Sequence, residues 1–250
     1  NDPDMWGSFT QSNNYLTHYR TSAEKKDHHI SEIIVTEPDN SRQVYGIPVY
    51  NLKQQEYSFA IGKASQYTPI GANGEQPNGP TNLALVDIVN GQVNYKKGID
   101  EYYHVDHIAP HATSYLLTEI LSPDYLDKTG DGVSDDDLGS AIKFNYSKLF
   151  NNYKWRTPYV NQPDPNKMAV TVNRGLLADP EDDKGSFVYG EKEIYYPQSI
   201  ETKTHIAIFI TADRDDALGV KGINGQREPG TQQKALTEIR LYAKGDLTVP

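Results

Sequence analysis

The feature that most restricts the fold is a short segment with the pattern of a β-hairpin. Residues 83–89 are almost entirely apolar, Asn90 and Gly91 follow them, and residues 92–95 resume a strand-like pattern. Asn-Gly readily adopts the two positive φ angles of a type I′ turn, which joins adjacent antiparallel strands. The sequence therefore predicts antiparallel β-structure at this point of the chain.

Other parts of the chain repeat the pattern of short apolar segments separated by Gly, Pro, Asn and Asp. Strands are expected at residues 30–35, 42–50, 56–61, 141–146, 153–156, 168–172, 186–189, 193–196, 204–211 and 238–242. Residues 114–121 fit either a strand or a helical turn, and residues 233–236 are a candidate for a short helical turn. Pro48 is expected at a sheet edge or a break, because proline cannot donate a ladder hydrogen bond. The pattern predicts an all-β, sandwich-like fold with multiple short antiparallel strands, long loops and little helix.

The predicted domain organisation is a single β-rich domain, residues 41–250, preceded by an irregular polar segment, residues 1–40. Residues 62–82 are rich in Gly, Pro, Asn and Gln and predict a long loop, which could hold an internal boundary. The chain starts at Asn1 and ends without a terminal signature, which suggests a part of a longer polypeptide.

The composition disfavours several classes of function. The chain has no cysteine, so it has neither disulfides nor thiolate chemistry. The net charge of −10 disfavours a nucleic-acid partner, which requires clustered Lys and Arg. No apolar run approaches the roughly 18 residues that a membrane-spanning helix needs. The 18 tyrosines favour a β protein in an extracellular or cell-surface location.

Residues 127–135 carry oxygen-bearing groups at alternate positions, as calcium-binding loops do. The predicted ligands of one Ca²⁺ ion are Asp127, Thr129, Asp131, the backbone carbonyl of Val133, and Asp135. Gly132 permits the sharp turn that such a loop requires. The ion is expected to be structural, because it would neutralise the aspartates and fix a loop between two strands. The alternative is an acidic, glycine-rich turn that holds no ion.

Two positions separate this loop from an EF-hand. Leu138 stands where the bidentate Glu should be, and the third position is Thr129. The loop more closely resembles those of integrin FG-GAP and thrombospondin type 3 repeats. Asp136 and Asp137 are the nearest candidates to complete the ion's ligand shell. The acidic turns at residues 179–183 and 213–216 could also supply ligands or bind a second ion.

His104, Asp106 and His107 form a weaker candidate site, for a metal-dependent hydrolase. Their spacing resembles half of the H-x-H-x-D-H signature of metallo-β-lactamase-type hydrolases, with Tyr102 where the first histidine should stand. The alternative is that these histidines are surface groups or hydrogen-bonded ones. The chain has neither a G-x-S-x-G elbow nor a phosphate-binding glycine loop, so no catalytic residue is assigned.

Several phrases of the sequence together resemble a region of large secreted bacterial proteins of the Rhs/YD-repeat, toxin-complex-like kind. They are VYGIPVYN at 44–51, SYLLTEIL at 114–121, TGDGVSDDDLG at 129–139, YKWRTPY at 153–159, GEKE at 190–193 and EIRLY at 238–242. The resemblance runs from about residue 42 to residue 245. It implies a non-catalytic β module within a long surface or exported polypeptide.

The leading hypothesis is therefore a calcium-stabilised structural or adhesive module with an unknown protein or glycan partner. A calcium-dependent carbohydrate-binding module, in which exposed Tyr or Trp forms a sugar platform, is the first alternative. A metal-dependent hydrolase that uses His104, Asp106 and His107 is the second.

Overall fold

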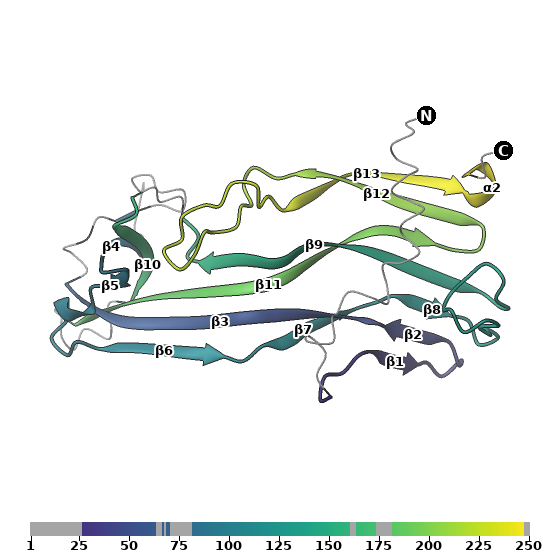
Figure 1. The fold of residues 1–250 in the computed structure, drawn as a ribbon, viewed down its shortest axis with the longest axis horizontal. Coiled ribbons are helices and arrows are strands. Elements are labelled where there is room, and N and C mark those ends of the chain that lie inside the picture. The colour runs from purple at the N-terminus through teal and green to yellow at the C-terminus, as the bar shows by residue number, and fades with distance from the viewer. Residues whose placement is uncertain are drawn as a thin grey trace.

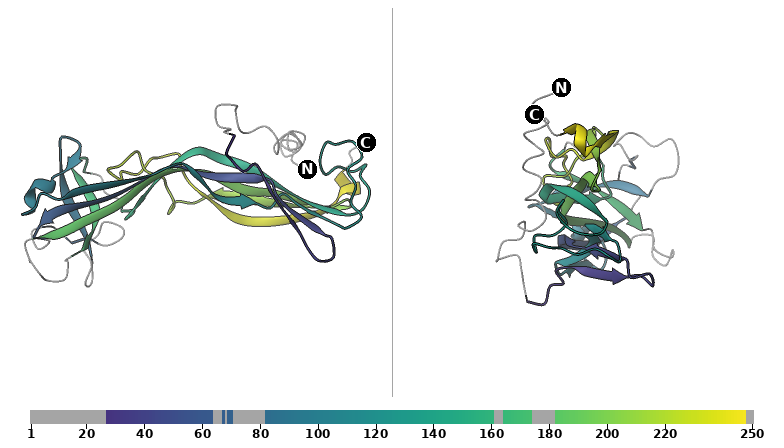
Figure 2. Two further views of the ribbon diagram at one scale, coloured as in Figure 1. Left: turned by 90° about the horizontal axis from the view of Figure 1, so that it is seen from below. Right: turned by 90° about the vertical axis from the view of Figure 1, so that its right-hand side faces the viewer.

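A computed structural model describes residues 27–63, 67, 69–70, 82–160, 164–173 and 182–247. The fold is nearly all β with one large antiparallel sheet, so the predicted fold class is confirmed. The molecule is long and narrow, and the sheet twists and bends along its length (Figure 1, Figure 2). The elements are β1 (Ile33–Thr36), β2 (Arg42–Tyr45), β3 (Ile47–Gly62), β4 (Leu83–Val89), β5 (Gln92–Val93), η3 (Tyr95–Lys97), β6 (Tyr103–Ile108), β7 (His111–Leu116), β8 (Glu119–Leu121), β9 (Ala141–Thr157), β10 (Lys167–Asn173), β11 (Asp183–Glu201), β12 (His205–Asp213), β13 (Lys234–Ala243) and α2 (Lys244–Leu247).

Strand β11 is the axis of the sheet and has two neighbours along each side. On one side β3 pairs with its first part and β12 with its last residues, while β10 and then β9 pair along the other side. In one half of the molecule the strand order is β6-β3-β11-β10-β4-β5, and in the other half it is β1-β2-β8-β9-β11-β12-β13. Strand β11 therefore joins the two halves into one sheet (Figure 1).

The central strands are longer than the sequence pattern predicts. Strands β3, β9 and β11 have 16, 17 and 19 residues, and each includes segments that were expected to be separate strands. Polar residues interrupt the apolar alternation but do not end the strands, because much of the sheet has a solvent-facing side and β-bulges absorb the irregularities. The helical turn expected at residues 233–236 is wrong, since β13 begins at Lys234 opposite Asp213.

Two local predictions are confirmed. Asn90 and Gly91 have φ angles of 52° and 78°, and Ile88 pairs with Val93 across the turn. Pro48 pairs with Tyr115 of β7, at a part of β3 that precedes its register with β11. Within residues 114–121, residues 114–116 end β7 and residues 119–121 form β8, with no helical turn between them.

The N-terminal segment predicted to be irregular contains strand β1, whereas residues 1–26 lie outside the described residues. Most of the predicted loop at residues 62–82 also lies outside them. The division at residue 40 and the internal boundary therefore stay predictions.

The main core lies where β4 and β10 pack over β3 and β11, which gives this half a sandwich-like arrangement. Its buried residues are Tyr57, Phe59, Ile61, Ala84, Val86, Val93, Met168, Val170, Val172, Phe187, Tyr189 and Val220. The other half has a smaller cluster, formed by Val44, Leu121 and Ala141. Among the described residues, no helix is long and apolar enough to cross a membrane.

Candidate functional site

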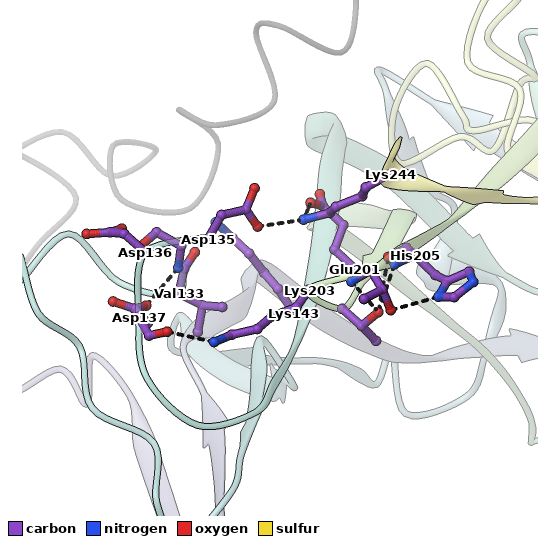
Figure 3. A network of polar contacts seen from close by, with 12 residues as sticks. Val133, Asp135, Asp136, Asp137, Lys143, Glu201, Lys203, His205 and Lys244 are labelled. Carbon is purple, nitrogen blue, oxygen red and sulfur yellow. Dashed lines mark hydrogen bonds and ion pairs between the residues drawn. The ribbon is translucent and has the colours of Figure 1, made fainter. Parts of the chain in front are cut away.

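The predicted calcium loop connects β8 to β9 at one end of the molecule, near the β11–β12 turn and α2 (Figure 1, Figure 3). The backbones of Leu126 and Leu138 close its base, because the N–H of each donates to the carbonyl of the other, at 3.2 and 3.1 Å. Leu138 is therefore the closing residue of the loop.

The first half of the loop winds around the carboxylate of Asp127. Its Oδ1 accepts the N–H of Thr129 at 3.1 Å and of Gly130 at 2.6 Å, and its Oδ2 accepts the N–H of Gly132 at 3.0 Å. Gly132 has a φ of 85°, the left-handed conformation expected of it. The Thr129 hydroxyl donates to Asp131 Oδ1 at 2.6 Å. The first three predicted ligands therefore lie together in one turn.

The last two predicted ligands face lysines. Lys143 Nζ, from β9, donates to the carbonyl oxygen of Val133 at 3.1 Å. Lys244 Nζ, from α2, lies 3.1 Å from Asp135 Oδ1 and 3.3 Å from Glu201 Oε2 (Figure 3). Ammonium groups thus occupy the side of the loop where two oxygens of the ion's ligand shell are predicted.

A third lysine extends this network from the β11–β12 turn. Lys203 Nζ donates to the backbone carbonyl of Asp137 at 2.6 Å (Figure 3). The three lysines surround a polar pocket of about 230 Å³, which Asp131, Val133, Ser134, Asp135, Ala141, Glu201 and Thr202 also line. The pocket thus places positive and negative groups side by side.

Asp137 has a structural role inside the loop. Its carboxylate accepts the hydroxyl of Tyr125 at 2.7 Å, the N–H of Ser134 at 2.9 Å and the N–H of Lys128 at 3.2 Å. These donors, the Tyr125 hydroxyl foremost, lower the pKa of Asp137 to about 2. Burial, and then the Asp137 carboxylate, raise the pKa of Tyr125. Asp136 accepts the Ser134 hydroxyl at 2.6 Å.

The loop fits calcium in the type of its donors, which are carboxylate, hydroxyl and carbonyl oxygens. Asp127, Thr129 and Asp131 lie together, whereas Val133 and Asp135 are turned toward the lysines. Within the described ranges, no three His, Cys, Asp or Glu side chains converge on a point that could hold a metal ion. The structure therefore brings part of the predicted ligand set together.

Sequence reasoning did not identify Lys143, Lys203, Lys244 or Glu201 as neighbours of the loop. They come from β9, the β11–β12 turn, α2 and the end of β11, which only the folded sheet brings next to residues 127–137. No local spacing signals such an approach.

The histidine cluster is divided between the two faces of β6. His104 Nε2 lies 3.0 Å from Asp106 Oδ1, so these two side chains form a pair on one face. His107 projects from the other face, where its Nδ1 lies 3.1 Å from Gln55 Nε2. The structure therefore does not bring His107 to the other two residues.

The acidic turn at residues 213–216 is occupied by basic partners. Asp213 pairs with Lys234, and Asp216 binds Arg214 at 2.7 Å. The turn begins at the end of β12 that lies away from the calcium loop (Figure 1). It therefore adds no ligand to that loop. Residues 179–181 lie outside the described residues.

Comparison with family models, with curated proteins and with solved structures gave no match for this chain.

Proposed function

We propose that the chain is a non-catalytic, calcium-stabilised structural or adhesive module of a large secreted or cell-surface bacterial polypeptide. The observation that carries the calcium proposal is the turn in which the Thr129 hydroxyl bonds the carboxylate of Asp131 while the Asp127 carboxylate organises the same turn. The extended antiparallel sheet and the resemblance to Rhs/YD-repeat proteins support the structural role.

Bound calcium would supply a divalent positive charge to the aspartates of the loop. Asp127, Thr129 and Asp131 would hold it from one side. The carbonyl of Val133 and the carboxylate of Asp135 are the remaining predicted ligands, and each now has a lysine as its partner. The role proposed for the ion is to fix the β8–β9 loop at the end of the sheet.

The proposal predicts that calcium raises the melting temperature of the protein. Because an ion that binds only the folded state stabilises it, 1 mM calcium should raise the Tm measured by differential scanning calorimetry, and a chelator should reverse the rise. The substitution Asp131→Asn should reduce the effect, since it removes one predicted charged ligand.

Asp39→Asn is the matched control, because Asp39 also caps a tight turn, by accepting the N–H of Ser41 at 2.9 Å, far from the loop in sequence. This variant should keep the full calcium response. A wild-type Tm that calcium leaves unchanged would remove the basis of the proposal.

A further inference from the structure

Eight side chains form a regular two-row grid on one face of the sheet. The strand register places His104, Ser58, Ser186 and Thr171 side by side in the first row, on β6, β3, β11 and β10. The second row consists of Asp106, Glu56, Val188 and Thr157, on β6, β3, β11 and β9. Cross-strand partners project to the same face, and so do residues two apart along a strand. All eight side chains therefore point the same way.

These eight residues, together with Tyr57 and Phe187, line a surface pocket of about 330 Å³. We call the short side chains of Ser58, Ser186 and Thr171 the floor of this pocket, and the longer side chains of His104 and Glu56 its rim. Its volume is at the lower end of the range of small-ligand sites.

The pocket offers many hydrogen-bonding groups that other side chains do not use. In the described part of the chain, the hydroxyls of Ser58, Ser186 and Thr171 have no hydrogen-bond partner. Glu56 Oε1 accepts from Gln54 at 2.8 Å, and Asp106 pairs with His104, so each carboxylate retains its second oxygen. The floor therefore offers hydroxyl groups that can donate or accept, and the carboxylates of Glu56 and Asp106 offer acceptors.

An indole ring lies in the next row of the same face. Trp155 pairs with Gly190 across β9 and β11, two residues beyond Thr157 and Val188. A Cβ atom at Gly190 would come within 2.5 Å of Cε2 and Nε1 of Trp155, so the ring lies directly over this glycine. The ring remains partly exposed, and Lys192 Nζ lies 5.8 Å from its centre. Gly190 therefore allows an aromatic ring to lie close to the sheet, one row beyond the pocket.

We propose that this surface, the grid together with Trp155, binds a short neutral glycan. A sugar ring has an apolar face that can stack on an indole, and hydroxyls that can pair with the carboxylate, imidazole and hydroxyl groups of the grid. The carboxylates of Glu56 and Asp106 disfavour an anionic ligand. The polar floor disfavours an apolar one, which would leave its hydroxyls unpaired.

This inference goes beyond the calcium-stabilised role and does not depend on it. The grid lies on β3, β6, β10, β11 and the last residue of β9, in the half of the molecule away from the loop between β8 and β9 (Figure 1). Glycan binding should therefore persist after calcium is removed, unlike binding by a calcium-dependent carbohydrate module.

The test is isothermal titration calorimetry of the full chain with cellotetraose, xylotetraose, mannotetraose and chitotetraose. At least one should bind, with the same affinity in calcium and in a chelator. Trp155→Ala should weaken that binding at least tenfold, and Ser186→Leu should do the same by filling the floor of the pocket. Ser147→Val is the control, since Ser147 is a partly exposed hydroxyl residue of β9 outside the pocket.

Circular dichroism identifies any variant that fails to fold, and Glu56→Gln, at the rim, supplies a milder substitution that should also weaken binding. Absence of binding to all four sugars would overturn the proposal, and so would unchanged affinity in the Trp155, Ser186 and Glu56 variants. Loss of binding in a chelator would place the ligand at the calcium loop instead. Binding without any calcium effect on Tm would reject the calcium proposal alone.

Discussion

Arg156 shows how this sheet accommodates a charge in its interior. Its guanidinium donates to the carbonyls of Ile223, Pro158 and Ala169 at 2.8, 2.9 and 2.6 Å, and lies 4.4 Å from the centre of the Phe187 ring. Burial lowers the pKa of Arg156 to about 9, which leaves it charged at neutral pH. One side chain thus fastens the segment around Ile223 to the core of the sheet.

Replacing this arginine should be costly. Arg156→Met would leave three carbonyls without their donor, and each such loss costs about 1 kcal/mol or more, so the free energy of unfolding should fall by about 3 kcal/mol. Urea denaturation followed by Trp fluorescence measures the change. A loss below about 0.5 kcal/mol, the range of ordinary surface substitutions, would contradict this role.

At the residue scale, the sequence predicted the sharp turn at Gly132, which has a positive φ. The Asp127 carboxylate, which was predicted as an ion ligand, accepts backbone N–H groups two to five positions away. The contacts of Lys143 and Lys244 with the loop could not be predicted in this way, since they depend on the alignment of distant strands.

At the scale of the element, β11 contains a bulge at Glu193, and this residue forms a buried ion pair with Lys148 of β9. Glu193 Oε1 lies 2.7 Å from Lys148 Nζ, and their side chains are 3 % and 7 % exposed. Glu193 Oε2 accepts the N–H of Tyr50 at 3.0 Å, just where the register of β3 with β11 ends at Asn51. The Glu193 carboxylate therefore bridges the point at which β3 leaves β11.

Breaking this pair should destabilise the protein more than breaking a surface pair. Glu193→Gln would leave the Lys148 ammonium buried without its counter-charge, at a cost of about 3 kcal/mol or more. The double variant with Lys148→Met should lose less than the sum of the two single losses, as a double-mutant cycle by urea denaturation would reveal.

The exposed pair of Lys97 and Asp87, at 2.7 Å, is the matched control. Lys97→Met should cost about 1 kcal/mol at most. Additive losses at Glu193 and Lys148 would show that the two side chains act independently.

The sequence predicted where most strands lie but not how far they extend. Ser186 to Tyr189 and Glu193 to Tyr196 were expected as two strands, and the structure joins them in β11. Residues between them make tertiary contacts: Trp155 covers Gly190, and Lys192 Nζ lies 5.8 Å from the centre of the same ring. Such contacts between strands leave no periodic signal in either strand alone.

At the scale of the whole molecule, the three long strands give a shape unlike that of a compact protein. Strands β3, β9 and β11 run lengthwise, and the main core occupies one half (Figure 1, Figure 2). The second half contains a smaller apolar cluster. The length of the molecule therefore comes from continuous strands that extend beyond the main core.

This shape should be measurable in solution. A compact chain of 250 residues has a radius of gyration of about 18 Å. Small-angle X-ray scattering of this protein should give a clearly larger value and a pair-distance distribution with a long tail. A value close to 18 Å with a symmetric distribution would contradict the extended sheet.

The placement of β1 and β13 has a mechanical consequence. Both strands belong to the half of the sheet ordered β1-β2-β8-β9-β11-β12-β13, at its opposite borders. Tension applied between them would cross that half from strand to strand. The half with β4, β6 and β10 would lie outside the path of the force. A ligand held on that half would stay bound while the half with β1 and β13 carries the load.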